Sequence, residues 1–146
     1  MKPDTAPLMT LRLAILSRGP RLYSTRRLVE EADARGCYVE VLDPMTLSIT
    51  VGNEKPRILN EGWPVEVDAV LPRIGYSITR HGVALVRQFE QLGVHVSNSS
   101  EGISRSGAKL RAPQWLTRNR IPIPTTCYVR SWHDDERAIH QVGGMP

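Results

Sequence analysis

The sequence predicts an α/β domain built on a four-stranded, mainly parallel sheet, and two patterns carry that prediction. Over the first hundred residues, apolar runs of strand length alternate with segments whose apolar residues recur at helical spacing. Polar loops containing Ser, Gly, Pro or Asp follow these runs, as expected of βα units. With 146 residues, 40% of them hydrophobic, the chain is long enough to bury a core of its own.

The first βαβ unit begins at the first apolar run. Residues 11–16 are apolar and too few for a helix, so they should form a central strand. A helix is expected over about residues 25–35, with Ser24 or Thr25 as its cap. Residues 37–42 then predict a second strand, which a crossover of this kind places parallel to the first.

The alternation of predicted strands and helices resumes after an irregular stretch. Residues 45–66 alternate only weakly and contain a turn, so we expect a loose hairpin or an excursion from the sheet. Residues 67–72 predict a third buried strand, and apolar residues from 83 to 92 follow helical spacing. Residues 94–96 make a fourth short strand, which completes the parallel sheet.

The last third of the chain is less regular. Residues 103–119 suggest a helix, but Gly107 and Pro113 disfavour its interior, so a kink or two short helices are expected. The remaining elements are an extended linker, a strand and a last short helix, at residues 121–126, 127–129 and 133–142. Residues 1–10 are expected to be a disordered extension.

Composition excludes several classes of protein. Nineteen basic and fifteen acidic side chains give a net charge of +4, which is too small to indicate nucleic-acid binding by itself. The histidines and cysteines lie at no metal-binding spacing, and no nucleophile motif occurs. No apolar run could cross a membrane, and no secretory signal is present. We expect a cytoplasmic protein with no membrane segment and no direct contact with nucleic acid; a homo-oligomer stays open.

The candidate site lies where the predicted strands end. In open parallel sheets ligands bind beyond the carboxyl ends of the strands, where four loops should gather: residues 17–24, 43–44, 73–77 and 97–100. Arg73, beside Gly75 and Ser77, could hold a carboxylate or phosphate, and Arg18 lies in the first loop. An Arg73 that pairs with a local acid or caps a loop is the structural alternative.

Several motifs resemble the start of the RimK-type glutamate ligases. The sequence DAVLPRIG at residues 68–75 looks like that family's DAVIPRIG, and LVRQFE at 85–90 stands where the family has LRQFE. Further segments agree in the same order: AILSR at 14–18, LDP at 42–44, KLR at 109–111, IPTT at 123–126 and VGGMP at 142–146. The resemblance therefore runs over almost the whole chain.

Members of this family are ATP-grasp enzymes that ligate glutamate to the C-terminus of small-subunit ribosomal protein six, with ATP and Mg²⁺ or Mn²⁺. The resemblance implies a Rossmann-like pre-ATP-grasp domain over residues 11–100 and the beginning of an ATP-grasp domain over residues 101–146. It implies that Lys109 binds ATP, and that Arg73, Gly75 and Ser77 face the cleft between domains as substrate-binding residues, with Arg18 added from the first loop.

The resemblance also limits what this chain can do. Most family residues that clamp the nucleotide and bind metal lie beyond Pro146, so no catalytic or metal-binding residue is assigned, and the chain alone should bind no cofactor and be inactive. Gly107 stands where the family usually has Asp, and Pro113 where it has no Pro; both weaken a helix that would aim Lys109.

The function expected is that of the N-terminal part of a RimK-like ligase whose partners are glutamate and a ribosomal protein or acidic peptide acceptor. One alternative is a stand-alone, non-catalytic binding module for an acidic peptide or ribosomal partner. A second is a nucleotide-binding or RNA-binding regulatory domain, based only on the charge and on the basic segment 102–120. If another domain covers the linker region, Trp115, Ile121, Ile123 and Trp132 should be solvent-exposed or buried by self-association.

Overall fold

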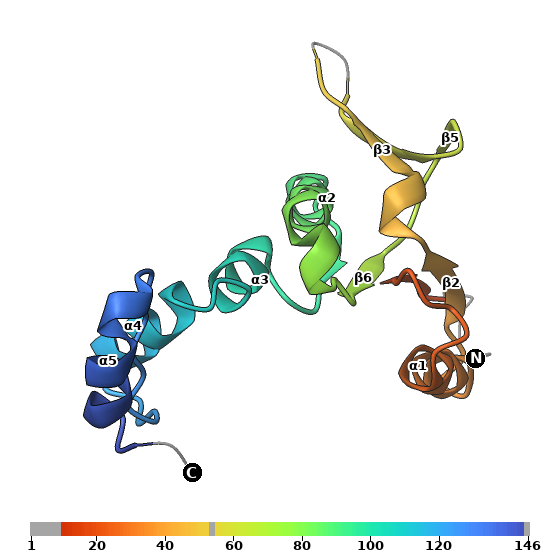
Figure 1. Cartoon of the computed structure of the whole chain (residues 1–146). Helices are drawn as coiled ribbons and strands as arrows, with labels where there is room; N and C mark the ends of the chain where they lie inside the picture. Colours follow the sequence, from red (N-terminus) through yellow and green to blue (C-terminus); the bar gives the residue numbers. More distant parts are fainter. Residues whose placement is uncertain (1–9, 53–54, 145–146) are drawn as a thin grey trace, which may run out of the picture. The chain divides into compact units, whose positions relative to one another are not determined.

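The chain folds into two compact units, Met1–Ser104 and Arg105–Pro146 (Figure 1). The computed structural model describes residues 10–52 and 55–144, so the expected disorder of the N-terminal extension falls, for residues 1–9, outside the described part. Within the described part, no helix is long and apolar enough to cross a membrane.

The main sheet of the first unit has four parallel strands, in the order β2-β1-β6-β7, as the apolar runs predicted. Its strands are β1 (Arg12–Leu16), β2 (Tyr38–Leu42), β6 (Ala69–Pro72) and β7 (His95–Val96). Strand β1 pairs on both edges, and Ala14, Ile15 and Leu16 are fully buried. A run that is apolar on both faces is typical of a central strand in such a sheet.

Helix α2 (Thr79–Gln91) supplies much of the core that covers this sheet. Its buried side chains include Val83, Leu85, Val86 and Phe89, which recur at helical spacing. Leu85, Val86 and Phe89 belong to one hydrophobic cluster together with residues of strands β1 and β6. The helix therefore holds strand β6, and the loop that follows it, against the rest of the unit.

Helix α1 (Tyr23–Asp33) begins two residues earlier than predicted, and neither Ser24 nor Thr25 caps it. The cap position is Leu22, which makes no side-chain capping hydrogen bond. Both hydroxyl groups instead bind partners outside the helix: Ser24 accepts from Arg73, and Thr25 shares a hydrogen bond with Ser17. The capping prediction was wrong because these side chains satisfy tertiary contacts.

The excursion between strands β2 and β6 is more regular than the sequence indicated. It forms an antiparallel sheet in the order β3-β4-β5. Its strands are β3 (Leu47–Thr50), β4 (Arg57–Asn60) and β5 (Trp63–Pro64), after a short 3₁₀ turn at Pro44–Thr46. Glu61 and Gly62 both have positive φ, 49° and 89°, as in a two-residue type I′ hairpin turn. Leu47 and Ile58 join the main core.

Arg12 of strand β1 and Asp68, which directly precedes β6, form an ion pair at the amino edge of the main sheet. The Arg12 amide donates to Asp68 Oδ2 at 2.8 Å, and its guanidinium Nη2 donates to Asp68 Oδ1 at 3.1 Å. The side-chain hydrogen bond from Arg12, followed by the amide hydrogen bond, lowers the pKa of the Asp68 carboxyl below its usual value.

Helix α3 (Ser100–Ser106) is anchored to the end of α2. The Ser100 amide donates to Glu90 Oε1 at 2.9 Å, and the Ser100 hydroxyl donates to Glu90 Oε2 at 2.6 Å. Ser100 is buried, so this carboxylate satisfies two polar groups at the beginning of the helix that water does not reach.

The second unit contains two short helices, α4 (Arg111–Arg118) and α5 (Asp135–Gln141). The predicted break between two helices is confirmed, because α3 ends at Ser106 and α4 begins at Arg111. Pro113 lies in the first turn of α4, where a missing N–H costs little. The predicted strand at residues 127–129 is wrong: the segment is extended and pairs with no strand of the described chain.

The second unit buries little apolar surface. Helix α4 has no buried residue, and Ala138 is the one hydrophobic residue of the described part of this unit that is buried. Trp115, Ile121 and Trp132 are exposed, as expected if another domain covers this region, whereas Ile123 is half-buried. The Arg105 guanidinium lies over the Trp115 ring, 4.1 Å from its centroid.

Gly82 permits the closest approach of α2 to the loop after strand β6. A Cβ at this position would lie 2.5 Å from Ile74 Cγ2. Gly82→Ala should therefore destabilise the first unit by about 1–3 kcal/mol through overpacking, although alanine is normally the better helix former by about 1 kcal/mol. Urea unfolding measures this, and a variant as stable as the parent or more stable would contradict the packing.

Asp68 should make the stability of the first unit depend on pH. Because its folded-state pKa is lowered, its contribution should be complete above about pH 4, the ordinary range of an unfolded aspartate, and be lost as the pH falls through the lowered folded value. The difference in urea midpoint between the parent and Asp68→Asn should narrow on acidification from neutral pH. A difference independent of pH would show that the Arg12 contact carries no such stabilisation.

Candidate functional site

The parallel ladder continues past the strand ends and brings three loops together at the carboxyl edge of the main sheet. Three amides just beyond the strands donate to a neighbouring chain segment: Ser17 N to Leu42 O at 2.9 Å, Arg73 N to Leu16 O at 2.9 Å and Ser97 N to Val70 O at 3.1 Å. These hydrogen bonds fix where each loop starts. The edge nominated from the topology is therefore formed by the expected segments.

Arg73 is held at this edge by a neutral partner. Its Nη2 donates to the Ser24 hydroxyl at 2.8 Å, which links the loop after β6 to the first turn of α1. Its Nε atom is buried and has no acceptor. Within the described chain Arg73 thus pairs with a hydroxyl rather than with the local acid of the structural alternative. A buried N–H without a partner on a charged group favours an incoming anion.

The first loop is fixed by a pair of buried hydroxyl groups. Ser17 Oγ and Thr25 Oγ1 lie 3.2 Å apart, and Ser17 Oγ also accepts from the Gly19 amide at 3.2 Å. Ser17 is 3% exposed and Thr25 is fully buried, so this pair orders the loop from beneath. Arg18, between them in the loop, is exposed and makes no ion pair in the described chain.

The loop after β6 presents small and polar groups. Gly75 and Ser77 are exposed, and Ser77 lies in the 3₁₀ turn Tyr76–Ile78 that leads into α2. A Cβ added at Gly75 would meet nothing within 4 Å, so the glycine leaves open space beside Arg73. Tyr76 is 84% exposed, and the sequence reasoning did not select it. An aromatic residue directly after a glycine at a strand end was the available signal.

A hollow of about 430 Å³ adjoins this loop. It is lined by Met45, Ser77, Ile78, Arg80, His81 and Ala84. His81 Nε2 lies 2.9 Å from the Pro44 carbonyl oxygen, which ties α2 to the loop after β2. The hollow combines an apolar floor with the polar ends of Ser77 and Arg80, a composition suited to a small polar ligand or a peptide side chain.

The described residues include no cluster of metal-ligating side chains. Lys109 belongs to the second unit and lies exposed in the turn between α3 and α4, not on a helix. No three His, Cys, Asp or Glu side chains come together in a metal-binding group within residues 10–52 and 55–144. One exposed lysine does not make a triphosphate site, so no nucleotide-dependent or metal-dependent step is assigned to these side chains.

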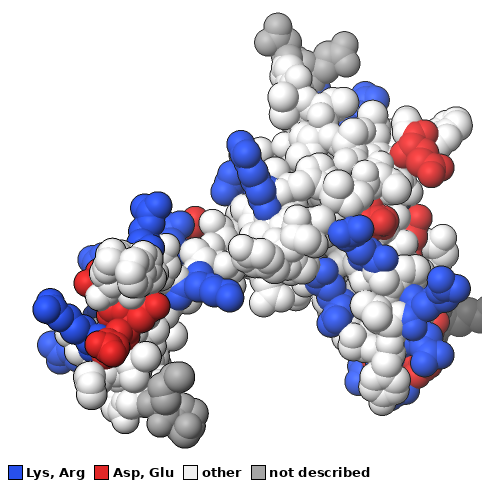
Figure 2. All heavy atoms as spheres, in the orientation of Figure 1, with Lys and Arg blue, Asp and Glu red and all other residues white. Residues whose placement is uncertain are grey.

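Basic and acidic side chains are interspersed on the face that Figure 2 draws. Figure 2 shows Lys and Arg side chains distributed over the face drawn, with Asp and Glu among them, rather than gathered in one stripe. Several arginines are neutralised locally, as in the pairs of Arg27 and Arg35 with Glu31, whose pKa the Arg35 hydrogen bond lowers. Arg73 differs from these arginines because its hydrogen bond leaves its charge uncompensated.

Comparison with known proteins agrees with this architecture. A protein of Aeromonas salmonicida named as a probable alpha-L-glutamate ligase is 52% identical over 137 residues, covering 93% of this chain and 46% of the relative. A protein of the same name from Halorhodospira halophila is 45% identical over 137 residues, covering 93% of this chain and 45% of its own length. The chain thus spans about half the length of these relatives.

A solved structure shares the fold. The ATP-grasp ligase PsnB, solved in complex with a minimal precursor, superposes with a TM-score of 0.66 over 92% of this chain and 51% of that one, at 18% sequence identity. The family model described as the RimK pre-ATP-grasp domain matches residues 11–103. With the parallel sheet and its carboxyl-edge loops, this match shows that the chain belongs to the RimK pre-ATP-grasp domain family.

Proposed function

We propose that this chain is the N-terminal part of an ATP-dependent ligase that attaches glutamate to a peptide or protein acceptor. The observation that carries the proposal is Arg73, whose guanidinium is held by a hydroxyl, is not neutralised by an acid and keeps one buried N–H without an acceptor. Such a group is suited to a carboxylate. Glutamate, the substrate in the relatives' printed names, carries two carboxylates.

The domain assignment follows the same resemblance. We propose that residues 11–100 are the pre-ATP-grasp domain and that residues 101–146 begin an ATP-grasp domain in which Lys109 contacts ATP. In the complete ligase ATP, with Mg²⁺ or Mn²⁺, would supply the free energy of amide formation. The matched family model and the names of the relatives support this assignment.

The residues of this chain would bind and orient substrate. Arg73 would hold a substrate carboxylate through its guanidinium, whose charge no described acid compensates, while Ser24 fixes the plane of that group. Gly75 leaves space for the substrate main chain, and Ser77 and Arg18 are exposed at the same edge, where they could add a hydroxyl contact and a second cation.

The acceptor in this proposal is the C-terminus of small-subunit ribosomal protein six or a related acidic peptide, in the cytoplasm. The family motifs quoted above support it. A stand-alone binding module would use the same edge without chemistry. The two functions differ in one measurement, because only a ligase releases ADP from ATP when both glutamate and an acceptor are present.

Arg73 offers the sharpest test of the proposal. In the protein as its natural gene encodes it, Arg73→Ala should lower kcat/KM for glutamate-dependent ADP release about 100-fold, within the cost of truncating one partner of a buried charge pair. Ser24→Ala removes one hydrogen bond and should cost about tenfold. The increase in KM for the carboxylate substrate should exceed the decrease in kcat.

The matched control is Arg87→Ala, since Arg87 is an exposed arginine on α2 without an ion pair in the described chain. It should leave the kinetics unchanged. Activity of Arg73→Ala equal to that of the control would remove Arg73 from substrate binding. Absence of glutamate-dependent ADP release in the parent protein would contradict the ligase itself.

A further inference from the structure

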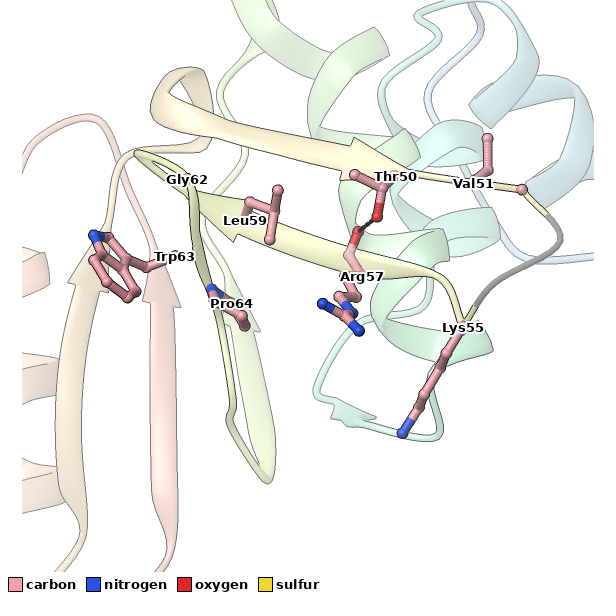
Figure 3. A pocket seen from close by; sticks show the side chains of 9 residues that line it. Thr50, Val51, Lys55, Arg57, Leu59, Gly62, Trp63 and Pro64 are labelled. Atoms are coloured by element: carbon pink, nitrogen blue, oxygen red, sulfur yellow. Dashed lines mark hydrogen bonds between the residues drawn. The ribbon is translucent and has the colours of Figure 1, made fainter.

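The small antiparallel sheet carries a second hollow, separate from the carboxyl edge of the main sheet. The hollow has a volume of about 540 Å³ and is lined from all three strands of this sheet and from the segment between β3 and β4 (Figure 3). Trp63 is 78% exposed and Val51 is 77% exposed. Large apolar side chains left in water beside a hollow mark an interaction surface more often than isolated exposed residues do.

The described charged residues that line this hollow are both cations. Lys55 and Arg57 both line the hollow, both are exposed, and neither makes an ion pair with a described residue. No acid is among the described residues that line it. Figure 3 shows the ends of both side chains on the same side of the hollow. A ligand for this surface therefore needs negative charge in addition to an apolar group.

Along the β5 edge, side chains rather than added strand pairing should provide the recognition. Strand β5 is only two residues long, pairs with β4 through Trp63 and Pro64, and forms one edge of the sheet. Pro64 has no N–H to offer an incoming strand. An indole face together with an ammonium and a guanidinium group suits carboxylates that flank an apolar side chain.

We propose that the surface formed by Val51, Lys55, Arg57 and Trp63 docks an acidic peptide, namely the acceptor once it carries glutamate. This inference rests on the proposed ligase function. Each ligation converts one acceptor carboxylate to an amide, its oxygen leaving with the phosphate released from ATP, and brings two glutamate carboxylates. The acceptor thus gains one negative charge per addition, and a cationic surface outside the reacting site retains it.

A nucleic acid suits this surface less well. A single aromatic residue and two cations form a short track, whereas single-stranded nucleic acids need a longer basic groove with several stacking positions. Exposed Glu61 lies beside β5 and would repel a phosphate backbone, and Glu66 on the other side of β5 is partly compensated by Arg12. A short peptide can place its carboxylates on the cations and avoid these two acids.

The test uses a fluorescein-labelled octapeptide in which glutamates flank one leucine, and its fluorescence anisotropy with the full chain. Lys55→Glu/Arg57→Glu should raise the Kd of this peptide at least about tenfold, and Trp63→Ala about tenfold. Lys55→Glu alone changes a residue outside the strands and should raise the Kd about threefold. The same octapeptide with glutamines in place of the glutamates should bind about tenfold more weakly than the parent peptide.

The matched control is Arg87→Glu/Arg130→Glu, which reverses two exposed arginines elsewhere and gives the same change in net charge. Its Kd should stay within about twofold of the parent value. Equal losses in both double variants, no binding by the parent chain, or tighter binding of a single-stranded oligonucleotide of eight residues would overturn the proposal. A dimer that Trp63→Ala dissociates would overturn it in favour of self-association.

The peptide-binding measurement and the measurement of glutamate-dependent ADP release test the two proposals separately. If the Kd of the acidic peptide were unchanged in Lys55→Glu/Arg57→Glu, the proposed docking surface would be wrong. The proposed ligase function would not be affected. Conversely, absence of glutamate-dependent ADP release would remove the ligase, even if the acidic peptide binds at Lys55 and Arg57.

Discussion

Strand β1 is hydrogen-bonded on both edges, to β2 and to β6, and the arrangement of the first unit depends on this double pairing. The registers place Leu16 opposite both Leu42 and Pro72, so the chain leaves the sheet at nearly the same level on three neighbouring strands. Ser17 and Arg73 follow directly and continue the ladder through their amides. The pairing on both edges, with the full burial of Ala14, Ile15 and Leu16, keeps β1 at the centre of the sheet.

This register determines which side chains meet at the carboxyl edge of the main sheet. Arg73 reaches Ser24 across 49 positions of sequence because α1 starts beside β6, and the tight contact of Gly82 with Ile74 holds the loop from the other side. The guanidinium is therefore oriented without being neutralised. The small sheet between β2 and β6 adds a second cationic surface around Trp63. The described part of the first unit thus carries uncompensated cations at two places, Arg73 at the main edge and Lys55 with Arg57 on the small sheet.

Local pattern was enough to predict the parallel sheet, since its strands are short apolar runs and α2 follows helical spacing. It failed for Ser24 and Thr25, which are residue types that often cap helices, because their side chains bind groups outside the helix, Arg73 and Ser17. Residues 127–129 have strand composition but no strand to pair with in the described chain. In the site, Arg73 could be selected as a strand-end cation, whereas its serine partner and the exposure of Tyr76 depend on tertiary packing.

Arg73, whose charge no acid of the described chain compensates, is the residue proposed to bind a substrate carboxylate, and NMR of the arginine side chains tests this role directly. In the ¹⁵N-labelled chain, the Nε–H resonance of Arg73 should move saturably when glutamate or a peptide ending in glutamate is added, whereas that of Arg87 should stay in place. A smaller shift of the Arg73 resonance in the Ser24→Ala variant would agree with the observed hydrogen bond between the two side chains. An Arg73 resonance that neither ligand moves, even at the highest soluble concentration, would contradict the assignment of this edge as the substrate site.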